Sequence, residues 1–399
     1  MAQSAQKRRA FTGPALYSHG FKSFFLFAGI WGVLSMSLWI SFLALGLEIP
    51  SRMAGVDWHM HEMVFGYTSA VIAGFLLTAV PNWTGRLPII GWSAALLSGL
   101  WVLGRGAVFF SEFLPQFAAP VVDGSFLLVL ALVIGREVIA GKNWRNLKVL
   151  INIAALAGAN ILFHIESLYG AAYQGYGVRL GVGLVILLIT IIGGRVVPSF
   201  TRNWLAKHNK NTLPLPRNML DNAVEILTAI ALLVWTFVPD AAGLWGGYLL
   251  IGALHLFRLW RWVGWHALAE PMVSVLHAGY LFVGVGFFIL AYANLSAGAF
   301  QSSQIPHAWM AGAIGIMTMA MMTRASLGHS GRPIKASAAI TLVYIFIIAA
   351  TLFRMVAEFY PSDILWLHLS ATTWIAGFAL YLVVYFPIFT RKKSPNIPG

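Results

Sequence analysis

The densest group of side chains that could hold a metal lies in one short stretch, Trp58-His59-Met60-His61-Glu62. Neutral imidazole nitrogens are common ligands of copper and of heme iron. Residues two apart in a helix point to nearly opposite sides, so we expect His59 and His61 to have different partners. Glu62 could orient one imidazole through its second ring nitrogen, as ligand histidines commonly require. The alternative is a hydrated polar helix end that binds nothing.

Three further histidines stand where they could act as ligands. His307 precedes one apolar stretch and His329 follows it, while His277 lies about one turn inside the preceding apolar stretch. A helix long enough to cross a bilayer would separate His307 from His329, so these two imidazoles cannot bind the same metal ion. For His277 and His329 the alternatives are a helix-end hydrogen bond and a hydrated loop. We interpret His164 as a packing or hydrogen-bonded residue.

The composition explains why such side chains matter. Hydrophobic residues make up 59% of the chain and charged residues 10%, whereas about 25% of residues are charged in soluble domains. Most of the surface is therefore expected to face lipid, where ionisable groups are costly and mark functional sites. There is no cysteine, which excludes disulfides, thiolate metal sites and iron–sulfur clusters. Any metal must bind to histidine, methionine or oxygen ligands.

The elements that must position these residues are membrane-spanning helices. A bilayer core requires about 20 apolar residues of helix, and about twelve stretches qualify. They form one all-α membrane domain over residues 1–399. We predict helices over residues 22–47, 60–80, 89–110, 118–139, 147–169, 178–198, 218–238, 242–262, 271–293, 305–327, 335–354 and 364–386. The longest loop is then 199–217, which is too short for a soluble domain.

The charges support this helix count and give an orientation. If the N-terminus is cytoplasmic, nearly all Lys and Arg residues fall at cytoplasmic helix ends, as the positive-inside rule requires. The exceptions are Arg52, Arg105, Arg179 and Arg354. Both termini are therefore expected in the cytoplasm. The net charge of +13 is spread over separate loops, which argues against nucleic acid as a partner and for membrane lipid.

A weak internal repeat suggests how the helices are grouped. The second predicted helix ends Val80-Pro81-Asn82-Trp83-Thr84, and the sixth ends in a similar Val-Pro-Ser-Phe-Thr run at residues 197–201. The tenth ends Thr323-Arg324 without the proline. Three similar ends, four helices apart, suggest three four-helix units. The alternative is that such short runs recur by chance.

Several long motifs resemble the NnrS family. They are WHMHEM at residues 58–63, AGFLLTAVPNWTGR at 73–86, GRVVPSFTRN at 194–203 and MTMAMMTRASLGHSGRP at 317–333. The resemblance covers nearly the whole chain. It implies a bacterial inner-membrane protein that contains heme and copper and is associated with nitric oxide and the nitrosative stress response.

The threefold grouping is also similar to the main subunit of heme–copper oxidases, which has twelve helices in a pseudo-threefold ring. That subunit holds a low-spin heme between histidines on its second and tenth helices, and for this chain we expect heme b. Here His61, or His59 in its place, and His307 stand in comparable positions. The oxidase copper site is not expected, because the predicted helices 178–198 and 218–238 contain no histidine and Trp309 replaces the second histidine of the tenth helix.

These resemblances lead to residue predictions. His61 and His307 are expected to hold a heme iron, and Arg105 is expected to pair with a heme propionate, since Arg forms strong charge-assisted hydrogen bonds. Snorkelling of Arg105 to the interface is the alternative. His59 could bind a second metal or replace His61. His277 and His329 are expected to contribute to an inner-side metal site, with copper as the candidate ion.

The leading hypothesis is a heme-binding membrane protein, with copper as a second candidate cofactor, that acts in nitric oxide metabolism or protection from nitrosative stress. Nitric oxide, or a related small molecule, would be its ligand. Two alternatives remain. A transporter could use the histidines as proton-relay or substrate groups, and a delivery factor could supply metal or heme to other enzymes.

Overall fold

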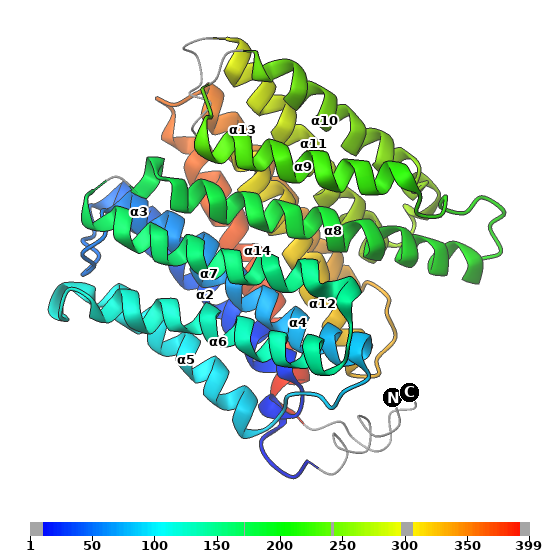
Figure 1. Cartoon of the computed structure of the whole chain (residues 1–399), viewed down its shortest axis with the longest axis horizontal. Helices are drawn as coiled ribbons and strands as arrows, with labels where there is room; N and C mark the ends of the chain where they lie inside the picture. The colour runs from blue at the N-terminus through cyan, green and yellow to red at the C-terminus, as the bar shows by residue number, and fades with distance from the viewer. Residues whose placement is uncertain (1–10, 171, 241–242, 297–305, 392–399) are drawn as a thin grey trace. The chain divides into compact units, whose positions relative to one another are not determined.

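The computed structural model describes residues 11–391, except 171, 241–242 and 297–305 (Figure 1). Within the described residues, eleven helices are long and apolar enough to cross a membrane. The remaining predicted span corresponds to α10 (Leu244–Trp260), whose 17 residues lie at the lower limit of roughly 17–25 for a spanning helix. The predicted all-helical membrane fold is confirmed.

The chain divides into two compact units. Unit 1 contains Met1–Val178, Met321–Pro333 and Phe378–Gly399, and unit 2 contains Arg179–Ala320 and Ile334–Gly377. The threefold grouping of helices and the single domain stay predictions.

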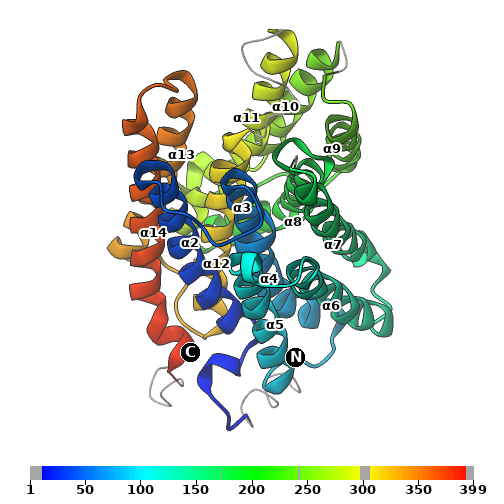
Figure 2. The same ribbon diagram turned by 90° about the vertical axis from the view of Figure 1, so that its left-hand side faces the viewer.

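Unit 1 is built around the central helix α4. Its helices are α2 (Gly20–Leu45), α3 (Gly55–His61), the π-helix η2 (Glu62–Thr68), α4 (Ser69–Thr84), α5 (Trp92–Phe109), α6 (Ala118–Ala140) and α7 (Leu147–Leu168). α4 packs against α2 and α6, and α6 packs against α5 and α7 (Figure 2). α4 ends at Gly85, whose φ of 70° is the left-handed conformation that favours glycine after a helix.

Unit 2 is built around α11. Its helices are most of α8 (Tyr176–Lys207), α9 (Met219–Phe237), α10, α11 (Pro271–Leu295), the π-helix η7 (Ala308–Ile316) and α13 (Ala338–Phe359). α12 (Met317–His329) and α14 (Ile364–Thr390) each pass from one unit to the other. α11 packs against α10, η7 and α13.

The predicted C-terminal boundaries of two helices are wrong. The sixth predicted helix was expected to stop at residue 198, but α8 continues through Pro198 to Lys207, so the loop to α9 is shorter than 199–217. Proline removes only one helical N–H, and membrane helices tolerate it where neighbouring groups satisfy the freed carbonyl. His329 is the last residue of α12 and not part of a loop.

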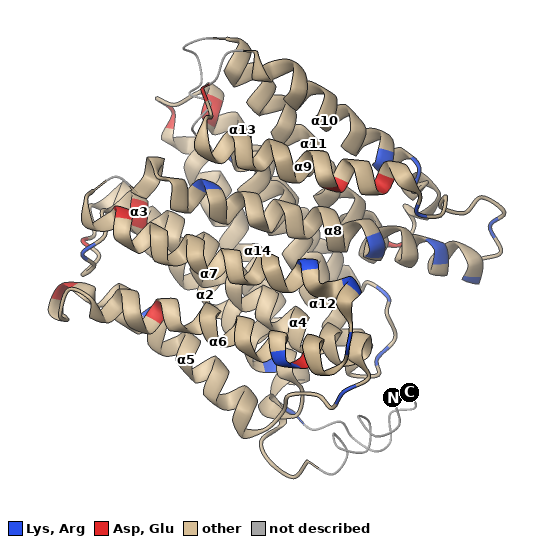
Figure 3. Ribbon diagram, viewed as in Figure 1, with Lys and Arg blue, Asp and Glu red and all other residues tan. Residues whose placement is uncertain are grey.

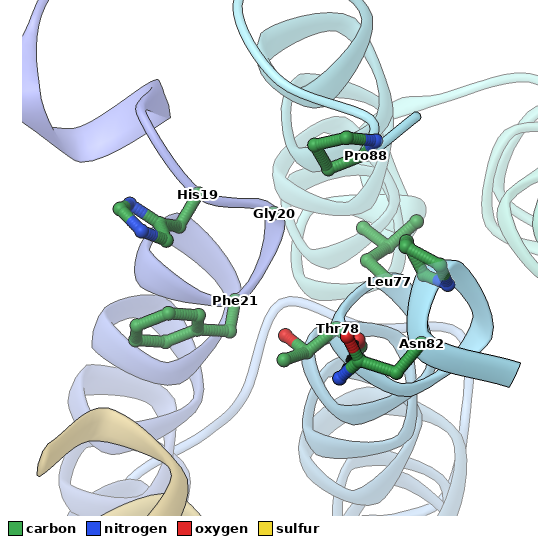
Figure 4. A pocket seen from close by; sticks show the side chains of 8 residues that line it. His19, Gly20, Phe21, Leu77, Thr78, Asn82 and Pro88 are labelled. Atoms are coloured by element: carbon green, nitrogen blue, oxygen red, sulfur yellow. Dashed lines mark hydrogen bonds between the residues drawn. The ribbon is translucent and has the colours of Figure 1, made fainter. Parts of the chain in front are cut away.

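The distribution of side chains on α9 is the reverse of that in a soluble protein. Asp221, Glu225 and Thr228 are buried, whereas Ile226 and Ile230 are more than half exposed. Exposed aliphatic side chains and buried polar ones are expected when the surrounding medium is lipid. Figure 3 shows Lys and Arg at the C-terminal end of α8 and in the loop that follows it, and also around the loop between α6 and α7.

Candidate metal centre

His61 and Glu62 lie at the junction of α3 and η2. His61 is the last residue of α3, and Glu62 begins the π-helix. Both side chains are fully buried. Single-turn π segments inside longer helices often occur at functional sites, and η2 is such a segment within the span Gly55–Thr84. The backbone therefore places one imidazole and one carboxylate side by side inside the helical bundle of unit 1.

Both ring nitrogens of His61 have partners. Nδ1 lies 3.0 Å from Glu62 Oε1. Nε2 lies 3.1 Å from Asp123 Oδ2 on α6 and 3.0 Å from Asn160 Oδ1 on α7. Glu62 therefore orients His61 through Nδ1, as predicted, and Nε2 points at oxygen atoms from two other helices.

Asp123 is the centre of this group. Its Oδ2 lies 2.9 Å from His164 Nε2 and 2.8 Å from Asn160 Nδ2. Its Oδ1 accepts a hydrogen bond from Arg105, which also donates to Glu62 Oε2 at 2.6 Å. We call the group the unit 1 site; its residues are His61, Glu62, Arg105, Asp123, Asn160 and His164.

Three residues of the unit 1 site can hold a metal ion. His61, Asp123 and His164 are all buried, and each offers one ligand atom within 4.8 Å of the others. Two ligands about 2 Å from an ion are at most about 4 Å apart, so a small contraction would bring all three into coordination. Two imidazoles and a carboxylate suit a first-row transition metal. Glu62 supplies the outer carboxylate that such ligand histidines usually have.

The charges of the unit 1 site also favour a cation. Two carboxylates, Glu62 and Asp123, face one guanidinium, Arg105. With neutral imidazoles the buried group has one negative charge in excess. Because uncompensated charge in a low-dielectric interior is costly, a bound cation would stabilise it.

Glycine makes room for the ion pairs. A Cβ on Gly66 would lie 2.5 Å from Glu62 Oε2 and 2.7 Å from Arg105 Nη1, closer than atoms can pack. A Cβ on Gly104 would lie 3.1 Å from Asp123 Oδ1. Trp31 Nε1 donates to Glu62 Oε2 at 2.7 Å, so Glu62 is fixed from three sides.

The predicted site residues are distributed as follows. His61 and Arg105 belong to the unit 1 site, whereas His59 stacks on Trp39 with ring centroids 4.4 Å apart. These two histidines thus have different partners, as predicted. Arg105 is 3% exposed and paired with two carboxylates, so the snorkelling alternative is wrong.

The other predicted ligands are not members of the unit 1 site. In unit 2, His307 Nδ1 lies 2.8 Å from Glu358 Oε1, and His277 Nε2 lies 2.8 Å from Thr201 Oγ1. His329 belongs to unit 1, with its ring 6.0 Å from that of Phe21. The pairs His61–His307 and His277–His329 each combine residues of both units and stay predictions.

The sequence did not identify Asp123 and Asn160 as residues of a site. It indicated only a packing or hydrogen-bonding role for His164. Asp123 could have been found, because it is a carboxylate inside a predicted membrane span, where such groups indicate function. Asn160 and His164 are four residues apart on α7 and therefore share one face. Nothing local in the sequence indicates that this face meets His61.

The fold and the unit 1 site define a polytopic helical membrane protein with a buried histidine–carboxylate centre. The family model for NnrS protein matches residues 15–393, and the chain therefore belongs to the NnrS family, as the motifs predict. This membership supports a membrane protein of the nitric oxide response. No curated protein matches the chain.

Proposed function

We propose that the protein binds a transition-metal ion at the unit 1 site and heme b, and that it acts in nitric oxide metabolism or nitrosative stress protection. The observation that carries this proposal is the convergence of His61, Asp123 and His164 in a member of the NnrS family. Copper is the ion we propose, since imidazole and carboxylate donors suit Cu(II) and the chain has no cysteine to favour a thiolate site.

The residues of the unit 1 site have separate roles in this proposal. Copper, when bound, would supply one-electron chemistry and a coordination position for nitric oxide. His61, His164 and Asp123 Oδ2 would hold the ion. Glu62 would fix the orientation of His61, and Arg105 would hold Asp123 by its other oxygen.

His307 is the histidine whose surroundings best fit a heme ligand. Its Nδ1 is bonded to Glu358, and Arg354 lies 3.6 Å from the same carboxylate oxygen. A carboxylate on Nδ1 is the usual support for an imidazole that binds metal through Nε2. We propose His307 as a ligand of heme b. His61 is assigned to the metal ion, because its Nε2 faces the same Asp123 oxygen as His164 Nε2.

Metal analysis and absorption spectra of the purified protein test the proposal. We expect one copper ion per chain and a Soret band. His164→Ala should lose copper and keep heme, whereas His307→Ala should lose heme and keep copper. His266→Ala, at an exposed histidine, is the control. A protein without metal or Soret band would contradict the proposal and favour the transporter, and a loaded protein that does not react with nitric oxide would favour the delivery factor.

We further propose that the protein lies in the bacterial inner membrane with both termini in the cytoplasm. The segregation of Lys and Arg supports this orientation. Reporter fusions test it. A fusion after Asp240 should report the periplasm and a fusion after Arg391 the cytoplasm; a cytoplasmic signal at Asp240 would contradict the topology.

A further inference from the structure

Unit 2 contains a second buried polar group that the proposed function does not use. It spans α9, α10 and α11, which lie next to one another (Figure 1). We call it the tyrosine network. Its members are all at most 2% exposed, and they are Asp221, Thr228, His255, Arg258 and Tyr280.

The Tyr280 hydroxyl lies between a guanidinium and an imidazole. Arg258 Nη1 lies 2.8 Å from the Tyr280 hydroxyl, and a guanidinium can only donate. The acceptor within reach of the Tyr280 O–H is His255 Nδ1, 3.0 Å away. In the tautomer that satisfies this O–H, His255 carries its proton on Nε2, which lies 2.9 Å from Thr228 Oγ1, and the lone pair on Nδ1 faces the phenol proton.

Arg258 is itself held in place by several acceptors. Its Nε donates to Asp221 Oδ1 at 2.7 Å, and its Nη1 also donates to the carbonyl of Thr190 at 3.0 Å. Arg261 Nη1 donates to Asp221 Oδ2 at 3.1 Å. The phenol is thus fixed between a permanent donor and a basic nitrogen.

A phenol that loses one electron becomes a very strong acid and must release its proton. In a dry interior, oxidation without a proton acceptor would leave a costly buried charge on the ring. A neutral imidazole in hydrogen-bond contact lowers this cost, because the proton moves along an existing hydrogen bond and the positive charge passes from the oxidised ring to a far more basic group.

We propose that Tyr280 is a redox-active tyrosine whose proton acceptor is His255. One electron leaves the phenol for a one-electron oxidant, the O–H bond breaks, and the proton forms a bond to His255 Nδ1. The products are a neutral tyrosyl radical and an imidazolium, and re-reduction returns the proton. The oxidant class is a nitrogen oxide radical such as nitrogen dioxide, which becomes nitrite; this choice rests on the proposed function, whereas the tyrosine chemistry does not.

Neighbouring aromatic rings provide short steps for the electron. The Trp262 ring lies 4.5 Å from that of Tyr280. On the other side, the rings of His255, Phe287, Trp309 and Trp235 follow one another at centroid distances of 5.6, 5.0 and 5.3 Å. Tryptophan is itself readily oxidised, so an oxidant need not contact Tyr280 directly.

Tyr248 is a matched control on α10. It is 2% exposed, and its hydroxyl has no hydrogen-bond partner among the described residues. Burial alone would make the two tyrosines equivalent. The hydrogen bonds to His255 and Arg258 distinguish Tyr280.

The experiment uses the purified full-length protein in detergent, after chelation to remove metal and without added heme. Photogenerated tris(bipyridine)ruthenium(III) is the oxidant, and electron paramagnetic resonance at low temperature detects the radical. We expect a tyrosyl signal in the parent protein and in Tyr248→Phe. The signal should fall at least fivefold in Tyr280→Phe and in His255→Gln, which keeps a polar side chain but removes the base.

Thermal melting identifies any variant that does not fold. A second measurement needs no variant: the rate of radical formation in the parent protein is compared between ordinary and deuterated buffer. Deuterium should slow radical formation, because a proton moves with the electron. No tyrosyl signal in the parent protein, an equal signal in Tyr280→Phe, or a signal lost only in Tyr248→Phe would each overturn the proposal. Loss of copper or heme binding elsewhere does not change these outcomes.

Discussion

The unit 1 site and the tyrosine network are both buried, charged and inside membrane-spanning helices, yet they are built in opposite ways. In unit 1, two carboxylates face one guanidinium, and two imidazoles converge on Asp123. In unit 2, Asp221 and Glu225 are bonded by three guanidinium groups, those of Arg217, Arg258 and Arg261. The unit 1 site has more hydrogen-bond acceptors than donors and an excess of negative charge. The group in unit 2 has more donors than acceptors.

This difference indicates what each group can bind. A cation needs converging acceptor atoms with a negative surplus, and among the described residues only His61, Asp123 and His164 form such a group. In unit 2 the two nitrogens of His255 contact the hydroxyl groups of Thr228 and Tyr280, so this histidine can exchange a proton with Tyr280 but shares no carboxylate with a second imidazole. Histidine inside a membrane helix is therefore not sufficient evidence of a metal site; the partners of its two nitrogens decide.

Asp123→Asn should have the largest effect, because it removes the centre of the unit 1 site. Replacing an outer partner of a ligand typically costs about 10–100-fold in metal affinity, and loss of the ligand itself should exceed that. The buried Arg105 would also lose one of its carboxylates, which costs about 3–5 kcal/mol of the free energy of unfolding. Metal titration and thermal melting measure the two losses. Glu112→Gln, at an exposed carboxylate, is the control and should change neither.

Arg258→Met should separate stability from metal binding. It leaves Asp221 and Glu225 with fewer partners and should cost about 3–5 kcal/mol of the free energy of unfolding, while copper per folded chain stays unchanged. Thermal melting and metal analysis of the same sample provide both values. Arg145→Met removes an exposed guanidinium and should have little effect on either. A parallel loss of copper in Arg258→Met would show that the contrast between the two groups is mistaken.

Gly66→Ala should have the smallest effect and tests the packing of the unit 1 site. The added methyl group would displace Glu62 and Arg105, the residues that support the ligands, so metal affinity should fall by about 10–100-fold. Gly99→Ala, where a Cβ would meet nothing within 4 Å, should keep full affinity. Equal affinity in the two variants would mean that the Glu62–Arg105 pair does not support the metal.

The two π-helices offer a further comparison. η2 begins directly after His61, and η7 begins directly after His307. His61 contacts Glu62, which also pairs with Arg105. In the same way, His307 contacts Glu358, which is also close to Arg354. The same arrangement of histidine, carboxylate and arginine thus occurs in both units, and in unit 1 a second imidazole, that of His164, lies 4.8 Å from His61 between ring centroids.

The sequence by itself determined the membrane fold, the helix positions and the family. Hydropathy over about 20 residues and the placement of Lys and Arg are local properties, and lipid imposes them directly on the chain. The sequence also identified His61, Glu62 and Arg105 as candidate site residues, because ionisable side chains are costly in an apolar membrane segment and indicate a functional site there.

Only the tertiary structure decided which of these groups meet. The metal centre needs α3, α6 and α7 to present His61, Asp123 and His164 to one point, and the tyrosine network needs α9, α10 and α11 in register. Side-chain convergence depends on how helices pack and rotate about their axes, and that is set by many weak contacts distributed over the bundle. No spacing along one helix contains this information, so Asp123 and the Tyr280–His255 pair became visible only in the folded chain.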